Sequence, residues 1–208
     1  QPRLICINGR TIAVLGCCER QFGSAGLNSP GVCPQDATIY QRIAECRKKA
    51  DIVIVSIHGA AEMDAWPSPA WQDLLRSFVQ AGADIVHGHH AHVPQGYERF
   101  EHGAIFYGLG NALVDPETWH ARPHTLWSLV AHCSFDERGL SIEVDTIVCT
   151  EEKQTISVRP SNPEESSQHR EYLNNCNQPL NERMMLEALW HETSVRQYYL
   201  YYGQWLNF

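Results

Sequence analysis

The fold is decided by residues 83–92, Ala83-Asp-Ile-Val-His-Gly-His-His-Ala-His92, read together with residues 51–58, Asp51-Ile-Val-Ile-Val-Ser-Ile-His58. In both stretches a strand-like apolar run ends abruptly in histidine beside glycine. Between them, Ser68-Pro69 predicts the start of a helix, and Gly82 predicts its end. The apolar positions of this helix recur at helical spacing: Trp71, Leu74, Leu75, Phe78 and Val79. The order strand, helix, strand predicts two parallel strands joined by a right-handed crossover, and therefore an α/β fold.

The histidines after these strands predict a metal site. The carboxyl ends of parallel strands meet at one edge of a sheet, so His58 and the cluster at 87–92 should converge. His90 and His92 project to the same side if the chain is extended there, and neutral imidazole is a common ligand of zinc, manganese and iron. One histidine at a strand end is more simply a satisfied polar residue, but several packed imidazoles without a metal would each need a hydrogen-bond partner. We therefore expect His58, His90 and His92 to bind a divalent metal.

Composition indicates a globular domain and argues against nucleic acid as a partner. The 208 residues are 43% hydrophobic and 19% charged, which is enough for a substantial core. The formal net charge of −8 lacks the basic footprint that nucleic-acid binding needs. No apolar run approaches the roughly 20 residues of a membrane span, and no signal peptide is expected at the start of the sequence.

The eight cysteines show no Cys-x-x-Cys spacing, which argues against structural zinc held by thiolates. Cys6, Cys133 and Cys149 lie inside apolar strand patterns, so we expect them to be small buried hydrophobic residues. Free thiols favour a reducing compartment such as the cytoplasm.

Turn signals predict three hairpins. They lie at Asn8-Gly9, at His102-Gly103 and across residues 136–139. After the second hairpin, Gly-Leu-Gly-Asn111 is either an ordinary turn or part of the site. The loop at 115–124 is either solvated or a recognition loop whose Arg122 contacts a carboxylate or phosphate bidentately.

Five stretches in this order resemble the second half of the CapA family of capsule or poly-γ-glutamate synthesis proteins: 51–58, Glu62, 82–86, 88–96 and 107–111. That family belongs to the calcineurin-like metallophosphoesterase superfamily. The resemblance implies a two-sheet α/β sandwich flanked by helices, with a dinuclear centre of manganese, zinc or iron at the strand ends. The family's leading Gly-Asp, Asn-x-Glu and Asn-Asn-His elements, which supply the bridging carboxylate, have no counterpart in residues 1–208, so the N-terminal part of the fold is missing from this sequence.

The family's site residues carry over position by position. Its His-Trp-Gly-x-Glu motif falls on His58 to Glu62, with Gly59 in place of tryptophan, and its Gly-x-His-Pro-His motif falls on residues 88–92, with Ala91 in place of proline. The resemblance implies metal ligands His58, His90 and His92, and a catalytic set of His58, His90, Glu62 and Asn111. His89 is an extra imidazole, which we assign with Arg122 and Asn111 to substrate binding.

Two functions remain open. One is a metal-dependent hydrolase or transferase acting on a phosphoester or a poly-γ-glutamate-type polymer, slow in this chain because the bridging carboxylate is missing. The other is a non-catalytic binding or scaffold component of a capsule or poly-γ-glutamate assembly. The resemblance to anchored family members implies the cell envelope, whereas the thiols favour the cytoplasm. Residues 1–150 would form the CapA-like domain, and residues 151–208 a polar linker and helical, aromatic appendix.

The incomplete fold should also expose part of its core to solvent. We expect an unpaired edge or exposed apolar flank around strands 52–57 and 12–15, covered by the aromatic tail after Tyr198 or by another chain. Self-association, or a partner chain that completes the fold, would follow.

Overall fold

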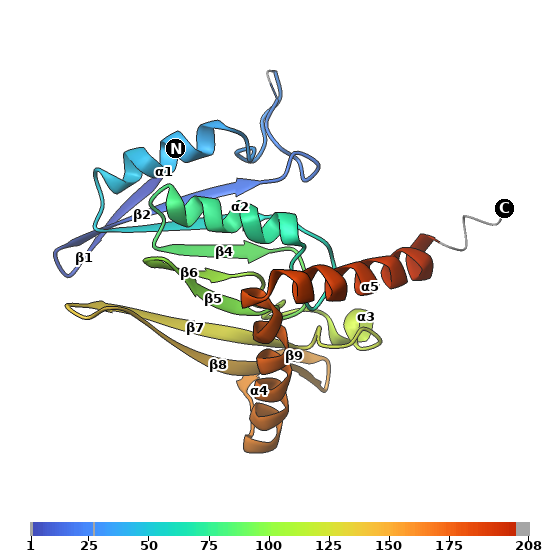
Figure 1. Ribbon diagram of the computed structural model, residues 1–208. Coiled ribbons are helices and arrows are strands. Elements are labelled where there is room, and N and C mark those ends of the chain that lie inside the picture. The colour runs from blue at the N-terminus through green and yellow to red at the C-terminus, as the bar shows by residue number, and fades with distance from the viewer. Residues whose placement is uncertain (1, 27, 203–208) are drawn as a thin grey trace.

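The computed structural model describes residues 2–26 and 28–202. Its main sheet consists of β1 (Arg3–Ile7), β2 (Arg10–Cys18), β3 (Ile52–His58), β4 (Ile85–His89), β5 (Tyr97–Phe100) and β6 (Gly103–Phe106). The strand order is β1-β2-β3-β4-β6-β5 (Figure 1). The four inner strands are parallel, and the edge strands β1 and β5 are antiparallel to their neighbours. The α/β class is therefore confirmed.

The strand-helix-strand unit lies where it was predicted. Helix α2 (Pro69–Gln80) joins β3 to β4, and the Ser68 hydroxyl caps it by accepting a hydrogen bond from the backbone N–H of Trp71 at 3.0 Å. The two strands are parallel, and His58 lies opposite His89 in the register. This pairing brings the histidines at both strand ends to one edge of the sheet.

The first hairpin also forms as predicted. Asn8 and Gly9 have φ angles of 51° and 78°, the left-handed conformation that a two-residue turn between strands requires. Because β1 is the edge of the sheet, Cys6 is exposed, and the expectation that it is buried was wrong. Cys149 is buried as expected, and Cys133 is partly buried.

Helices α1 (Thr38–Arg47) and α2 cover one face of the main sheet (Figure 1). Alternate residues of β2 and β3 point into this layer because successive strand side chains face opposite sides. The core between strands and helices includes Ala13, Leu15, Val53, Val55, Ile57, Ile39, Ile43, Leu75 and Phe78. Helix α1 did not emerge from the sequence patterns.

The predicted unpaired edge was wrong in its position. Strand β2 pairs with β1 and β3, and β3 pairs with β2 and β4, so both are inner strands. The apolar flank is present in a milder form: on the face turned away from α1 and α2, Ile12, Val14, Ile54 and Ile85 are partly buried. The aromatic tail proposed to cover it, after Tyr198, lies outside the residues whose side chains the structure describes.

A second, antiparallel sheet contains β7 (Trp127–Asp136), β8 (Gly139–Glu152) and β9 (Thr155–Pro160). The long hairpin across residues 136–139 is confirmed, whereas β9 was not predicted. Between β6 and β7 in the sequence, the short helix α3 (Pro116–Trp119) interrupts the loop at 115–124. The two sheets do not by themselves establish the calcineurin-like sandwich, which stays a prediction.

The C-terminal segment consists of α4 (Pro163–Asn177), the 3-10 helix η1 (Gln178–Asn181) and α5 (Arg183–Tyr202). It buries Leu173, Leu180 and Leu186. Within residues 2–26 and 28–202, no helix is both long and apolar enough to cross a membrane. The division at residue 150 stays a prediction, and β8 continues past that boundary.

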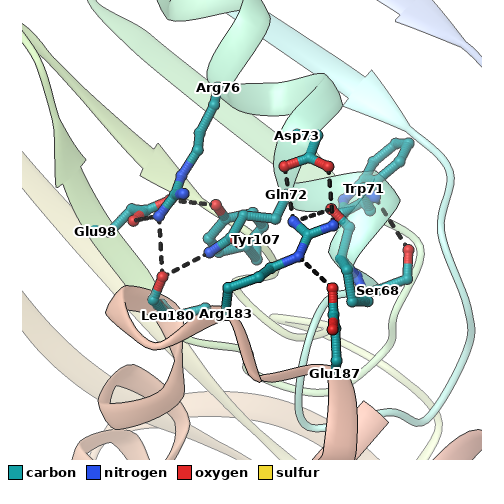
Figure 2. A network of polar contacts seen from close by, with 11 residues as sticks. Ser68, Trp71, Gln72, Asp73, Arg76, Glu98, Tyr107, Leu180, Arg183 and Glu187 are labelled. Carbon is teal, nitrogen blue, oxygen red and sulfur yellow. Dashed lines mark hydrogen bonds and ion pairs between the residues drawn. The ribbon is translucent and has the colours of Figure 1, made fainter. Parts of the chain in front are cut away.

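A polar network joins the C-terminal segment to α2 and to the main sheet (Figure 2). Arg76 on α2 binds both carboxylate oxygens of Glu98 on β5, at 2.8 and 2.6 Å. The Tyr107 hydroxyl donates a short hydrogen bond to the same carboxylate. The carbonyl of Leu180 in η1 accepts from Arg76 at 2.9 Å and from Gln72 at 2.8 Å. The C-terminal segment is thus anchored to the sheet by buried polar contacts as well as by apolar ones.

Candidate metal centre

The paired ends of β3 and β4 place two imidazoles next to each other, with ring centroids 4.8 Å apart and an angle of 63° between the ring planes. The Nδ1 atoms of His58 and His89 are 2.9 Å apart. One of these nitrogens must carry a hydrogen for the contact to be a hydrogen bond. The ring of His87, two residues before His89 on the same strand face, has its centroid 5.3 Å from that of His89.

After β4 the backbone adopts positive φ angles. His90 has a φ of 117° and His92 a φ of 63°, values that non-glycine residues adopt rarely. Such strain tends to cluster where function fixes a side chain. The turn places the ring of His90 between those of His58 and His92, with centroid distances of 4.7 and 5.5 Å.

Glu62 completes the tightest cluster of donor atoms. Its Oε1 lies 3.4 Å from Nε2 of His90 and 3.9 Å from Nε2 of His92. Among His, Cys, Asp and Glu side chains in the described part of the chain, these three form the one group of three or more with ligand atoms all within 4.8 Å of one another. Of the three predicted metal ligands, His90 and His92 belong to this group, whereas His58 is paired with His89.

Asn111 fixes the orientation of His92. Its amide Oδ1 lies 2.7 Å from Nδ1 of His92, and its Nδ2 donates to the carbonyl of Thr125 at 3.1 Å. Because the Thr125 carbonyl requires a donor, the amide oxygen must face the imidazole, and Nδ1 of His92 carries the hydrogen. The lone pair on Nε2 then faces Glu62, as metal binding requires.

Burial lowers the pKa of three histidines at this edge of the sheet, His87, His89 and His90. It lowers the pKa of His87, and it lowers that of His89 to about 4 with help from the neighbouring histidines. For His90, burial lowers the pKa more than the Glu62 carboxylate raises it. At neutral pH these rings therefore have the free lone pair that binds metals.

Glu19 is a site residue that sequence reasoning missed. It follows the end of β2, its backbone N–H donates to the carbonyl of His58 at 2.9 Å, and its Oε2 accepts from the N–H of Ala60 at 3.1 Å. A Cβ at Gly59 would lie 2.7 Å from the Glu19 side chain, so the glycine in place of the family's tryptophan makes room for this carboxylate. The signal was available, because β2 is parallel to β3 and ends at the same edge.

Two aromatic rings that were not predicted border the histidines. Phe22 has its centroid 4.8 Å from His58 and 4.3 Å from His90, and Trp119 on α3 lies 4.7 Å from His92.

Arg122, predicted to bind substrate, is not among the clustered donors; its guanidinium carbon lies 4.9 Å from the centre of the Trp119 ring. An open pocket of about 440 Å³ adjoins the His58 and His89 pair.

Comparison with known proteins assigns the family. Residues 1–116, more than half of the chain, match the family described as bacterial capsule synthesis protein PGA_cap. The chain belongs to this family. Over 113 residues it is 42% identical to the PGA biosynthesis protein CapA of Bacillus subtilis, and over 119 residues it is 35% identical to the capsule biosynthesis protein CapA of Bacillus anthracis.

Each of these two matches covers 52% of this PGA_cap chain, and they cover 30% and 28% of the two relatives. A probable polyglutamine synthesis accessory protein of Mycobacterium tuberculosis is 32% identical over 71 residues, which are 34% of this chain and 19% of the relative. The chain therefore spans less than a third of the length of these curated relatives. The resemblance to CapA proteins is confirmed, and the roles of individual residues stay predictions.

Proposed function

We propose that this chain provides the histidine side of a divalent metal centre in a hydrolase or transferase of capsule or poly-γ-glutamate synthesis. One observation carries the proposal: the ligand atoms of Glu62, His90 and His92 all lie within 4.8 Å of one another. Two imidazoles and a carboxylate suit manganese, zinc or iron. Membership of the PGA_cap family supports a role in capsule or poly-γ-glutamate synthesis. The proposed substrate is a phosphoester or a poly-γ-glutamate-type polymer.

The arrangement of the imidazoles suggests two neighbouring metal positions. The first is the group of Glu62, His90 and His92, and the second is the pair His58 and His89, with the ring of His90 between them. Bound metal would supply Lewis-acid polarisation of the substrate and activation of water. Glu62, whose side chain is 52% exposed, can accept a proton at the solvent side of the group.

The second candidate function is a binding or scaffold component of a capsule or poly-γ-glutamate assembly. It is favoured by the shortage of carboxylates, since Glu62 is the single acidic member of the group of three. Under this alternative the site holds at most one metal well and does little chemistry.

Calorimetric titration with Mn²⁺ or Zn²⁺ tests the metal site. His90→Ala should abolish tight binding, while His102→Ala, an exposed histidine in the turn between β5 and β6, should bind like the wild type. Unchanged binding by His90→Ala would reject the site. Hydrolysis of a phosphodiester tests whether the centre is complete in this chain: turnover should be far slower than that of a typical enzyme, about 10 per second, and a rate of that order would show that the centre is complete.

A further inference from the structure

We propose that a pocket beside the metal centre binds a carboxylate on an aliphatic chain, with Arg122 as the residue that determines specificity. The pocket has a volume of about 220 Å³, and its walls include Met63, Val93, Arg122, Pro123, His124 and Tyr172. The inference deepens the proposed function and rests on it for the reaction that the bound ligand would undergo.

The pocket and the metal centre share their backbone. Met63 follows Glu62, and Val93 follows His92, so each segment contributes one residue to the group of three and the next to the pocket wall. The Trp119 ring connects the two sites, because it lies 4.7 Å from the ring of His92 and 4.9 Å from the guanidinium carbon of Arg122. A ligand held in the pocket is therefore next to the metal ligands.

Arg122 has unused binding capacity. Within residues 2–26 and 28–202, its guanidinium has no hydrogen bond or ion pair; its contact is with the face of Trp119. A guanidinium that lies over an aromatic ring keeps its N–H groups available at its edge, and their fork geometry matches a carboxylate bidentately.

His124 offers a second donor. Its Nδ1 accepts a hydrogen bond from the indole N–H of Trp127 at 3.2 Å, so the neutral ring carries its hydrogen on Nε2. The ring also packs on Tyr172, with centroids 4.1 Å apart, and the Tyr172 hydroxyl is already bound to the carbonyl of Pro94. Tyr172 therefore presents its apolar ring to the pocket.

The chemistry of the walls selects the ligand. Most of the wall is apolar, formed by Met63, Val93, Pro123 and the Tyr172 ring. Arg122 is the one side chain in the wall that is always positively charged. One guanidinium in an apolar pocket suits a singly charged carboxylate on methylene groups better than a doubly charged phosphate, which needs more cations. A γ-linked glutamate unit has this composition, with two methylenes and one carboxylate per repeat.

Binding of a γ-linked glutamate pentapeptide, measured by calorimetry at low salt, tests the inference. Arg122→Ala should weaken binding roughly tenfold or more, and Arg122→Lys should weaken it less, because lysine keeps the charge without the fork. Arg138→Ala, an exposed arginine in the turn between β7 and β8, should bind like the wild type. The pentapeptide with its carboxylates amidated should not bind, and inorganic phosphate should not compete.

Wild-type affinity in Arg122→Ala, or equal displacement by phosphate, would overturn the inference. The titrations are repeated with Mn²⁺ present and in His90→Ala, which separates this inference from the proposed function. Binding that depends on Arg122 in a chain that binds no metal would retain the pocket and reject the metal centre. Binding that requires the metal and does not depend on Arg122 would retain the metal centre and reject the pocket.

Discussion

Asn111 shows how a single side chain can set the tautomer of a histidine that lies 19 residues away in the sequence. Its amide is fixed by the Thr125 carbonyl and in turn fixes the hydrogen of His92 on Nδ1. Partners that orient a metal-binding histidine in this way typically affect metal affinity by 10- to 100-fold.

We therefore expect Asn111→Ala to weaken Mn²⁺ binding by roughly 10- to 100-fold while His90 and Glu62 stay in place. Calorimetric titration measures the loss. Asn181→Ala, an exposed asparagine in η1, is the matched control and should bind normally. If Asn111→Ala binds as tightly as the control, the amide does not orient His92.

At the same scale, the histidines were predictable and their grouping was not. Strand ends and glycines placed His58, His90 and His92 at one edge, because parallel strands share that edge. The register that pairs His58 with His89, and the turn that brings Glu62 to His90, depend on tertiary contacts. Glu19 was not predicted for a different reason, because the weak pattern of helix α1 hides the crossover that makes β2 parallel to β3.

At the scale of elements, local signals predicted some segments and failed for others. The cap at Ser68 and the turn at Asn8-Gly9 are local, and both formed. Helix α1 is short and buries only Ile39, Ile43 and Cys46, which gives a weak apolar stripe. Strand β9 is largely exposed and ends at Pro160, so it is defined by pairing with β8 and not by its own pattern.

Helix α4 begins with a charge-dependent cap. The backbone N–H of Asn162 and the guanidinium of Arg159 both bind the Glu165 carboxylate, which lowers the pKa of Glu165 from 4.5 to about 2, with the Arg159 contact as the main cause. A carboxyl group whose pKa is lowered in the folded state stabilises that state above pH 4.5, and this contribution is lost as the pH falls toward 2.

Glu165→Gln should therefore reduce the loss of stability between pH 4.5 and 2, and it should lower stability at pH 7 slightly, because the ion pair with Arg159 is partly exposed and is screened by solvent. Urea unfolding at a series of pH values measures both effects. Glu164→Gln, one residue earlier and without a hydrogen-bond partner in the described residues, is the control. The same loss of stability below pH 4.5 in both variants would show that the cap does not contribute to stability.

The polar network of Figure 2 contains one buried ion pair, Arg76 with Glu98 between α2 and β5, and one exposed ion pair, Asp73 with Arg183 between α2 and α5. The Glu98 side chain is 4% exposed in its pair with Arg76, whereas the side chains of Asp73 and Arg183 are 59% and 44% exposed. Removing one partner of a buried pair leaves an uncompensated charge, whereas an exposed pair is screened by water.

We expect Glu98→Ala to lower the free energy of unfolding by about 3–5 kcal/mol, because it leaves the Arg76 charge without its counter-ion and the Tyr107 hydroxyl without its acceptor. The matched variant Asp73→Ala should cost about 0–1 kcal/mol. Urea unfolding compares the two. Equal, small losses would mean that water replaces the Glu98 carboxylate and that the network does not anchor the C-terminal segment.

At the scale of the whole molecule, the two faces of the main sheet are not covered equally. One face is covered by α1 and α2, while the opposite face leaves Ile12, Val14, Ile54 and Ile85 only partly buried. Strand β1 closes one side of the sheet, and all five of its residues are exposed. Local patterns predicted the hairpin of β1 and β2 and an apolar flank on β2 and β3, but they did not show that β1 would be the exposed edge of the sheet.

An unpaired edge with apolar side chains is a template for another strand, and β1 exposes Leu4, Ile5 and Ile7 by 52%, 38% and 50%. We expect the chain to self-associate as its concentration rises, which sedimentation velocity would detect. Ile5→Lys combined with Ile7→Lys should weaken the association, because each charge would have to be buried against a second strand. Met184→Lys, at an 85% exposed position on α5, should leave it unchanged. A monodisperse monomer throughout, or equal loss of association in both variants, would show that β1 does not act as an interface.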